Sequence, residues 1–324
     1  MSALNGAGDE GEVVVALDVG GTGIKCALVG LADRAVRHAE RHPTWAARGP
    51  AAVAETICEL AEKLAGTARD RGLTPVASGI AVPGVVDEAS GTAVWSANVG
   101  FRDVPLRDLV AARTGLPAAL GHDVRAGGVA EARIGAARGS RHVLFIAIGT
   151  GIAAASVVDG RTYSGAHGAA GELGHVVVRP GGPACGCRQA GCLEAIASAG
   201  AVARRYAEQA GRDPAGAAEV ARLAADGDPV ATTVWTEAID ALADGLLIGQ
   251  AMFDPEIVVL GGGLAEAGGQ LLDPLGRMMR AKRTFHRLPR LVPAALGDEA
   301  GCLGAALLAA DAIPSSGDVS RVQV

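Results

Sequence analysis

Two copies of one pattern, a strand, a turn of small residues and a second strand, constrain the fold of this chain more than any other sequence feature. The first turn is Gly20–Gly23 and the second is Gly149–Gly151. Apolar, β-rich runs flank both turns, and we expect strands over Val13–Val19, Ile24–Val29, Arg141–Ile148 and Ile152–Val158. Glycines between two such runs are typical of hairpins. The repetition predicts a duplicated α/β architecture with one hairpin in each half.

The glycine turns differ from the two common nucleotide-binding loops. A Walker A loop ends in Gly-Lys and opens a helix, and the sequence contains no Gly-Lys pair. The dinucleotide-binding pattern also fails, because a strand and no third glycine follows Gly23. A hairpin can still bring its backbone close to phosphate oxygens, with Asp18 at the strand end meeting a magnesium ion directly or through water. An ordinary tight turn with a solvated Asp18 is the alternative.

The rest of the chain alternates apolar strands with amphipathic helices. Further strands are expected at Val76–Val82, Pro117–Leu120, Ile257–Leu260 and Leu291–Leu296, with a loop at Trp95–Phe101. Helices are expected at Pro50–Asp70, Pro105–Thr114, from Asp123 to Ala137, Glu194–Gly211, Pro214–Ala225, Pro229–Met252 and Glu299–Ala312. A chain of 324 residues with these elements can form two lobes, each with its own core.

Asp123 and the triplet Gly261–Gly263 each stand where a predicted strand gives way to a helix. A helix cap would explain Asp123 fully. The functional alternative is a base that orients a hydroxyl nucleophile for phosphoryl transfer. The triplet would open a helix near Leu264, where backbone N–H groups could face a nucleotide's sugar or phosphate. A plain strand-to-helix turn would explain the triplet equally well.

The segment 171–195 combines metal ligands with acidic residues. It contains three cysteines at C-x-C-x4-C spacing and an upstream histidine: Cys185, Cys187, Cys192 and His175. Three thiolates and one imidazole form the ligand set of a closed, structural zinc site. Glu172 and Glu194 are interleaved with these ligands, so zinc would clamp polar side chains where they could hold a polyol. A zinc knuckle far from any chemistry, or reduced thiols buried as small apolar groups, is the alternative.

Charge and hydropathy exclude some classes of partner. The net charge of −6 argues against nucleic acid, whose binding depends on phosphate neutralisation. No run of about 18 apolar residues is present to span a membrane, and the polar start MSALNGAGDEGE lacks the features of a signal peptide. Together with cysteines at metal spacing, this predicts a cytoplasmic protein. We expect flexible tails at 1–12 and 314–324.

Together these motifs resemble the ROK family of sugar kinases and sugar-responsive repressors, which has the actin-like ATPase fold. The resemblance covers about Val13 to Ala312. It rests on Asp18-Val19-Gly20-Gly21-Thr22 with Lys25, the run GIAVPGVVD from Gly79 to Asp87, Asp123, Gly149-Thr150-Gly151, Glu172-Leu173-Gly174-His175, the cysteine segment through Glu194, and Gly261-Gly262-Gly263. It implies a two-lobed, ribonuclease-H-like α/β fold with a small structural zinc site. The lobes would be 13–121 and 122–298, with the zinc segment at 175–192 and a closing helix at 299–313 that packs back on the first lobe.

The resemblance also implies a role for each motif. Asp123 would be the catalytic base for a sugar 6-hydroxyl. The sugar would also be bound by Gly84, Asn98, His122, Glu172, His175 and Glu194. ATP and Mg²⁺ would be bound by Asp18, Gly20, Gly21, Thr22, Gly23, Lys25, Gly149, Thr150, Gly151, Gly261, Gly262 and Gly263. Zinc would be held by His175, Cys185, Cys187 and Cys192, and the other ring nitrogen of His175 would face the sugar. Closure of the two lobes would exclude water as a competing acceptor.

Two residues depart from the family pattern. His122 stands where most family kinases have Asn before the catalytic Asp, so a side chain expected near the 3- and 4-hydroxyls of the sugar has changed. A polar site can reject an analogue that lacks its partner by about 10⁴–10⁵-fold, which leaves the preference at these positions open. Arg188 stands where a Gly usually follows the second Cys. The ligand spacing is retained, and we expect zinc to be retained with it.

The leading hypothesis is an ATP- and magnesium-dependent hexose 6-kinase with glucose as the default substrate. It would be a cytoplasmic homodimer that binds a small-molecule sugar and neither nucleic acid nor a membrane. An amino-sugar kinase acting on N-acetylglucosamine, glucosamine or a similar sugar is the alternative that His122 keeps open. A non-catalytic sugar sensor or a regulator is a third possibility. Family repressors carry a helix-turn-helix domain ahead of the core, and the residues before Val13 are too few for one.

Overall fold

The computed structural model describes residues 11–313, which form two compact units. Unit 1 runs from the start of this range to Ala130 and includes Gly165–Ala169 and the chain from Glu299 onward. Unit 2 comprises Glu131–Ser164 and Ala170–Asp298. Of the expected tails, residues 1–10 and 314–324 lie outside the described residues, and Glu12 already belongs to the first strand. The first unit extends past the lobe boundary expected at Gly121 and therefore includes Asp123.

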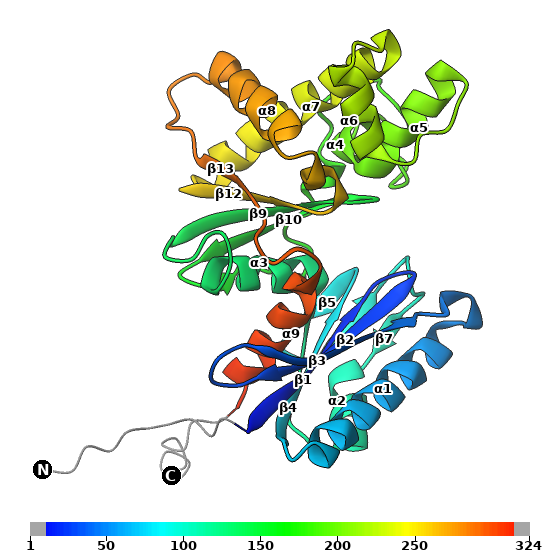
Figure 1. Cartoon of the computed structure of the whole chain (residues 1–324), viewed down its shortest axis with the longest axis vertical. Helices are drawn as coiled ribbons and strands as arrows, with labels where there is room; N and C mark the ends of the chain where they lie inside the picture. Colours follow the sequence, from blue (N-terminus) through cyan, green and yellow to red (C-terminus); the bar gives the residue numbers. More distant parts are fainter. Residues whose placement is uncertain (1–10, 314–324) are drawn as a thin grey trace, which may run out of the picture. The chain divides into compact units, whose positions relative to one another are not determined.

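Unit 1 is built on a five-stranded sheet (Figure 1). Its strands in spatial order are β3 (Val36–Pro43), β2 (Gly23–Gly30), β1 (Glu12–Val19), β4 (Thr74–Val82) and β8 (Ala118–His122). The first three pair antiparallel, and β4 and β8 join them in parallel. Helices α1 and α9 both contact β1 and β4 and cover opposite faces of the sheet. Buried on both faces, β1 is a continuous apolar run and not an alternating one.

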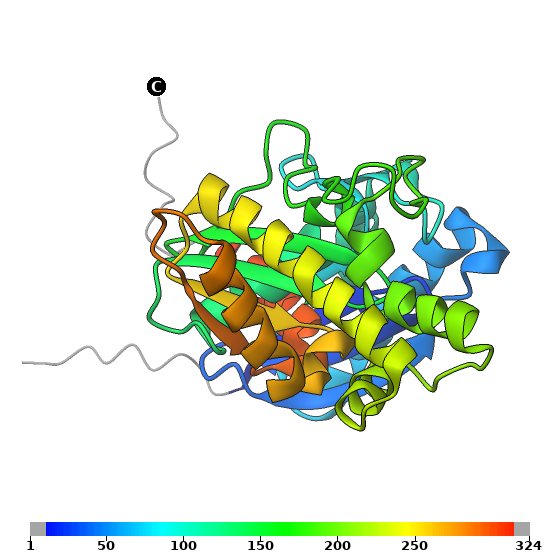
Figure 2. The same cartoon turned by 90° about the horizontal axis from the view of Figure 1, so that it is seen from above.

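Unit 2 contains a second five-stranded sheet with the same arrangement. Its strands in spatial order are β11 (Arg161–Thr162), β10 (Ile152–Val158), β9 (His142–Ile148), β12 (Ile257–Gly261) and β13 (Arg290–Pro293). Again the first three pair antiparallel and the last two join in parallel. The duplicated architecture predicted from the two hairpins is therefore confirmed. The long helix α7 (Pro229–Phe253) lies across this sheet (Figure 2).

The helices of unit 1 follow the predicted pattern closely. They are α1 (Pro50–Asp70), α2 (Leu106–Thr114), α3 (Asp123–Arg133, which reaches unit 2 at its last turn) and α9 (Ala300–Asp311). Pro50 stands in the first turn of α1, where its missing N–H costs nothing, and Val53 and Ile57 face the core. A small sheet of β5 (Val85–Asp87), β6 (Thr92–Trp95) and β7 (Arg102–Val104) completes the unit. The expected loop thus begins after Trp95, which ends a strand.

Several helices, most of them in unit 2, begin or end at other residues than expected. The helices of unit 2 are α4 (Leu193–Ala197), α5 (Ala199–Ala210), α6 (Ala217–Ala225), α7 and α8 (Gly269–Lys282). The single helix expected over Glu194–Gly211 is wrong, because Ser198 is extended and its hydroxyl accepts the N–H of Ala201 (3.0 Å) as the cap of α5. The helix expected to reach Ala137 ends at Arg133 instead. There the buried Glu131 carboxylate accepts the N–H of Ala136 (2.8 Å) and turns the chain away.

The helix start expected near Leu264 was also wrong. The triplet Gly261–Gly263 leads into a 3₁₀ turn, Gly263–Ala267, and the α-helix α8 begins only at Gly269. No helix among residues 11–313 is long and apolar enough to cross a bilayer.

Candidate active site and metal centre

The β1–β2 hairpin of unit 1 holds the first group of predicted site residues. Asp18 and Lys25 are direct partners in the strand register, with Nζ and Oδ2 3.5 Å apart. The turn between them is closed by the N–H of Gly20, which donates to the carbonyl of Gly23 (2.8 Å). Asp18 is largely buried, with 15% of its side chain exposed, so it is not the solvated aspartate of an ordinary surface turn. A partly buried carboxylate beside a glycine turn is a suitable ligand for Mg²⁺.

Two residues that sequence reasoning missed hold this hairpin in place. The buried Thr44 donates its hydroxyl to the carbonyl of Gly20 (2.6 Å) and its N–H to the carbonyl of Thr22 (3.1 Å). Gly301, in the first turn of α9, leaves space for Asp18, since a Cβ there would lie 2.2 Å from Oδ2. Neither residue belongs to a recognisable motif. A Thr shortly after a strand and a Gly in a helix carry no signal until the tertiary contacts are known.

Asn98 and Gly84 lie in the same unit. A Cβ at Gly21 would be 3.2 Å from the Cβ of Asn98, so the exposed Asn98 stands beside the hairpin turn. Gly84 separates β4 from β5 and has a φ of 106°. The structure therefore brings a predicted sugar contact next to a predicted phosphate turn.

His122 ends β8 and Asp123 begins α3. The Nδ1 atom of His122 accepts the N–H of Arg125 (3.4 Å), the i to i+3 contact of a helix cap. The Asp123 Oδ1 atom instead accepts the N–H of Val124 (2.7 Å). His122, and not Asp123, therefore caps α3. The helix-cap alternative does not explain why Asp123 is present.

The surroundings shift the pKa of both side chains. Burial, and to a lesser extent the positive charge of Arg125, lower the pKa of His122 to about 3 against the opposing charge of Glu88. The imidazole is therefore neutral near pH 7, and its 3.3 Å approach to the Asp123 carboxylate is not an ion pair. Desolvation raises the pKa of Asp123, opposed by the Val124 N–H and the charges of Arg125 and Lys25. A carboxylate made more basic in this way is better suited to accept a proton.

The β9–β10 hairpin of unit 2 contains the second glycine turn. The N–H of Gly149 donates to the carbonyl of Gly151 (2.9 Å), which closes the turn around Thr150. Glu194, in α4, accepts the N–H of Ile152 (2.9 Å) through Oε2. The structure thus joins two features that the sequence assigned to different tasks, a sugar ligand and a phosphate turn.

The four predicted metal ligands lie together in unit 2. The ligand atoms of His175, Cys185, Cys187 and Cys192 are all within 4.8 Å of one another. The sulfurs of Cys187 and Cys192 are 3.6 Å apart, and Cys185 Sγ is 3.6 Å from His175 Nδ1. Tetrahedral zinc with its usual bond lengths separates two sulfurs by about 3.8 Å and a sulfur from a nitrogen by about 3.6 Å. The donor types and spacing therefore fit a structural zinc ion.

The metal ligands are joined directly to the acidic residues. Cys192 directly precedes α4, which carries Glu194 two residues after this cysteine. The 3₁₀ turn Leu173–His175 follows Glu172, and His175 Nε2 lies 3.8 Å from a Glu172 oxygen. His175 therefore directs Nδ1 to the metal cluster and Nε2 to a carboxylate that is 45% exposed.

The Gly261–Gly263 turn follows the buried strand β12 in the same unit. A Cβ at Gly262 would lie 2.5 Å from the carbonyl of Ile148, at the start of the Gly149–Gly151 turn. The two glycine segments are therefore neighbours. A 3₁₀ turn and not an α-helix follows, so the α-helix N-terminus expected near Leu264 does not lie at this triplet.

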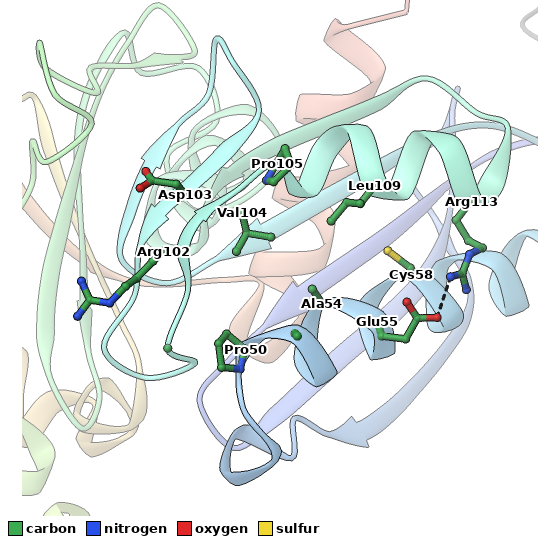
Figure 3. Close-up of a pocket in the computed structure, with 12 residues that line it drawn as sticks. Pro50, Ala54, Glu55, Cys58, Arg102, Asp103, Val104, Pro105, Leu109 and Arg113 are labelled. Carbon is green, nitrogen blue, oxygen red and sulfur yellow. Dashed lines mark hydrogen bonds and ion pairs between the residues drawn. The ribbon is translucent and has the colours of Figure 1, made fainter.

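A cavity of about 510 Å³ in unit 1 lies between α1, α2 and β7 (Figure 3). Its lining is mostly apolar, and the Glu55–Arg113 ion pair (2.7 Å) stands at one end. None of its lining residues is a predicted site residue. This cavity is therefore not part of the predicted sugar, ATP or metal sites.

Comparisons with known proteins agree with the motifs. The model of the ROK family matches residues 14–312. A glucokinase from Thermotoga maritima is 34% identical over 317 residues, which cover 90% of this chain and 96% of the relative. The crystal structure of a ROK hexokinase from Thermus thermophilus has a TM-score of 0.80 at 37% identity and covers 92% of this chain and 97% of its own. A ROK family glucokinase from Streptomyces griseus, in complex with glucose and AMPPNP, has a TM-score of 0.78 at 28% identity and covers 92% and 99%.

These matches extend over nearly every described residue and over nearly the whole of each relative. The duplicated sheets are those of the actin-like ATPase fold. The chain is a member of the ROK family.

Proposed function

We propose that this protein is an ATP-dependent hexose 6-kinase with glucose as its substrate. The observation that carries the proposal is Asp123, at the start of α3, with a pKa raised by desolvation and with its capping role taken by His122. A carboxylate in this state can accept the proton of a sugar hydroxyl as the phosphoryl group is transferred. The similarity to glucokinases over the whole chain supports the same conclusion.

In this proposal Asp123 orients the 6-hydroxyl and receives its proton. Glu172, His175 and Glu194 accept or donate hydrogen bonds around the sugar's other hydroxyls. Gly84, Asn98 and His122 complete the set of sugar contacts. Since the His122 Nδ1 atom faces the Arg125 N–H and the Asp123 carboxylate, only Nε2 of this residue is left to contact the sugar.

The two glycine hairpins would bind the phosphates of ATP. The glycines of these two turns have no side chains that would keep phosphate oxygens away from the backbone. Lys25 adds a positive charge, and Asp18 would hold Mg²⁺, which neutralises the charge that develops on the phosphates. The Gly261–Gly263 turn would lie against the adenosine. Zinc, held by His175 and the three cysteines, would keep the segment that carries Glu172 and Glu194 in one conformation.

The finer expectations from the sequence belong to the same proposal. They are the lobes at 13–121 and 122–298 with a closing helix at 299–313, a cytoplasmic homodimer, and the lack of a nucleic-acid or membrane partner. Light scattering of the purified protein in solution tests the oligomeric state, and a titration with labelled DNA tests the nucleic-acid expectation.

A coupled assay of ADP release over a panel of hexoses tests the function. The panel contains glucose, mannose, N-acetylglucosamine, glucosamine and N-acetylmannosamine, each with ATP and Mg²⁺. We expect the highest kcat/KM with glucose. A higher value with an amino sugar would assign the alternative kinase activity. Sugar binding by calorimetry without any ADP release would identify a non-catalytic sensor and contradict the proposal.

A further inference from the structure

A buried arginine stands two residues after Asp123. Arg125 is among the largest fully buried side chains of the protein. Burying a charged group without enough partners is costly, and replacing a buried ion pair by apolar residues of similar volume is often neutral or stabilising. Stability alone therefore does not explain why a guanidinium occupies this position.

The guanidinium joins separate segments of unit 1. Its Nε atom donates to Oε1 of Glu88 (2.8 Å), in the turn after β5. Its Nη1 atom donates to the carbonyl of Gly168 (3.0 Å). The third nitrogen, Nη2, is buried and has no hydrogen-bond partner among residues 11–313. A charged donor left unpaired is a further cost that a purely structural arginine would be expected to avoid.

The Gly168 contact matters because of where this residue stands in the chain. Residues Gly165–Ala169 belong to unit 1, although the chain on both sides of them belongs to unit 2. Gly168 lies close against β5, since a Cβ on it would be 2.4 Å from the carbonyl of Val86, and its φ is +70°. After Ala169 the chain reaches Glu172 and His175 within a few residues.

We infer that Arg125 is a positioning residue that ties the segment Gly165–Ala169 to the start of α3. The Arg125–Gly168 hydrogen bond, backed by the Glu88 ion pair, determines where the chain leaves unit 1 before it reaches the sugar-binding Glu172 and His175. The helix that presents the base and the segment that leads to the sugar ligands thereby share one anchor. Arg125 acts through Gly168 and does not touch the reacting atoms. This inference rests on the proposed hexose-kinase function.

The test compares substitutions of Arg125 with a matched control on the same helix. Arg133 also donates its Nε to a glycine carbonyl, that of Gly160 (2.9 Å), but it lies in the last turn of α3. In Arg125→Lys, the charge remains and the fork that reaches two acceptors is lost. We expect KM for glucose to rise by about tenfold to 10²-fold, because small misplacements of binding groups have effects of this size. KM for ATP should stay within about twofold, and Arg133→Lys should change neither constant beyond that range.

Two further variants distinguish positioning from folding. Guanidinium ion at millimolar concentration should lower the glucose KM of Arg125→Ala and leave Arg133→Ala unaffected. Gly168→Ala, which displaces the same segment without touching Arg125, should raise the glucose KM in the same way. If Arg125→Ala does not fold, the glucose KM values of Arg125→Lys and Gly168→Ala are sufficient to test the inference. Unchanged glucose KM in both of these, or equal rises in the KM values of glucose and ATP, would overturn the inference.

Amide hydrogen exchange separates this inference from the proposed function. In Arg125→Lys, exchange at residues 165–171 should be faster than in the wild type, whereas exchange in β1 and β9 should be unchanged. A wild-type protein without hexose-kinase activity would refute the function, and the exchange result would still decide whether Arg125 anchors this segment. Unchanged exchange at 165–171 would show that it does not.

Discussion

The two glycine hairpins have the same topology but are held by different chemistry. In unit 1 the turn after β1 is fixed by a neutral hydroxyl, that of Thr44, which follows the full-length strand β3. In unit 2 the turn after β9 is fixed by a carboxylate, Glu194, on a short helix that follows the zinc-ligand residue Cys192. The corresponding edge strand, β11, is only two residues long. The duplicated sheet therefore provides two similar turns. The residues that hold each turn, Thr44 and Glu194, lie outside the paired strands and differ between the two units.

The largest effect should come from Asp123, the proposed base, which lies in unit 1. Asp123→Ala should lower kcat by about 10²–10⁴-fold, the usual cost of removing a general base. The glucose affinity should change much less, as calorimetry would show. If turnover stays within about tenfold of the wild type, the assignment of Asp123 as the base is wrong.

Removal of the metal should affect unit 2 first. Cys187→Ser, or chelation of zinc, should weaken glucose binding by about 10- to 100-fold, because groups that orient ligands around a metal have effects of this size. Elemental analysis should find about one zinc per chain in the wild type and less in the variant. A metal-free protein with normal glucose affinity would contradict the role proposed for the cluster.

The two anchors of the turns should be separable by their effects on the two substrates. Thr44→Val removes the hydroxyl bond to Gly20 with little change of shape and should raise KM for ATP by about fivefold, the equivalent of a hydrogen bond of roughly 1 kcal/mol. Glu194→Ala should raise the KM values of both ATP and glucose, since Glu194 holds the Gly149–Gly151 turn and is also a proposed sugar ligand. An effect of Glu194→Ala on ATP alone would remove this residue from the sugar site.

The smallest effect concerns stability against pH in unit 1. Burial lowers the pKa of His122 to about 3, against about 6.5 in an unfolded chain. Between these values the unfolded state binds a proton that the folded state does not, so His122 makes the protein less stable as the pH falls below about 6.5. Asp123 has a raised pKa in the folded state, so it makes the protein more stable as the pH falls through that raised pKa. The free energy of unfolding of His122→Asn should therefore rise by about 2 kcal/mol relative to that of the wild type as the pH is lowered from 7 to 5.

Denaturant unfolding at a series of pH values measures this difference. The comparison of wild type with His122→Asn cancels the contribution of every group that does not contact the substituted side chain. Asp123 lies 3.3 Å from His122, so the same pair is also compared in an Asp123→Asn background, which removes its contribution. Parallel stability curves for the two proteins from pH 7 to pH 5 would mean that His122 is not buried as a neutral group.

Much of the fold was predictable because its signals are local. The apolar runs of β1 and β9, the glycines of both turns and the Pro50 start of α1 predict their own conformations. The metal cluster was predictable for a related reason, since three cysteines and a histidine at short spacing have few other arrangements. The errors came where a single side chain ends or divides a helix, as at Ser198 and Glu131. Both contacts are local, from Ser198 to Ala201 and from Glu131 to Ala136, but the same side chains are also compatible with a continuous helix. The apolar period alone therefore does not show where the helix stops.

The sequence by itself determined the duplicated α/β plan, the group of three cysteines and one histidine, and the position of Asp123 between a strand and a helix. Only the tertiary structure decided which residue caps that helix, which residues hold the glycine turns, and that the buried Arg125 donates to the carbonyl of Gly168. The physical reason is the range of the interactions. Strand and turn preferences act between neighbours in the chain, whereas hydrogen bonds such as Arg125 to Gly168 or Thr44 to Gly20 join residues far apart in sequence, which meet only when the core is packed.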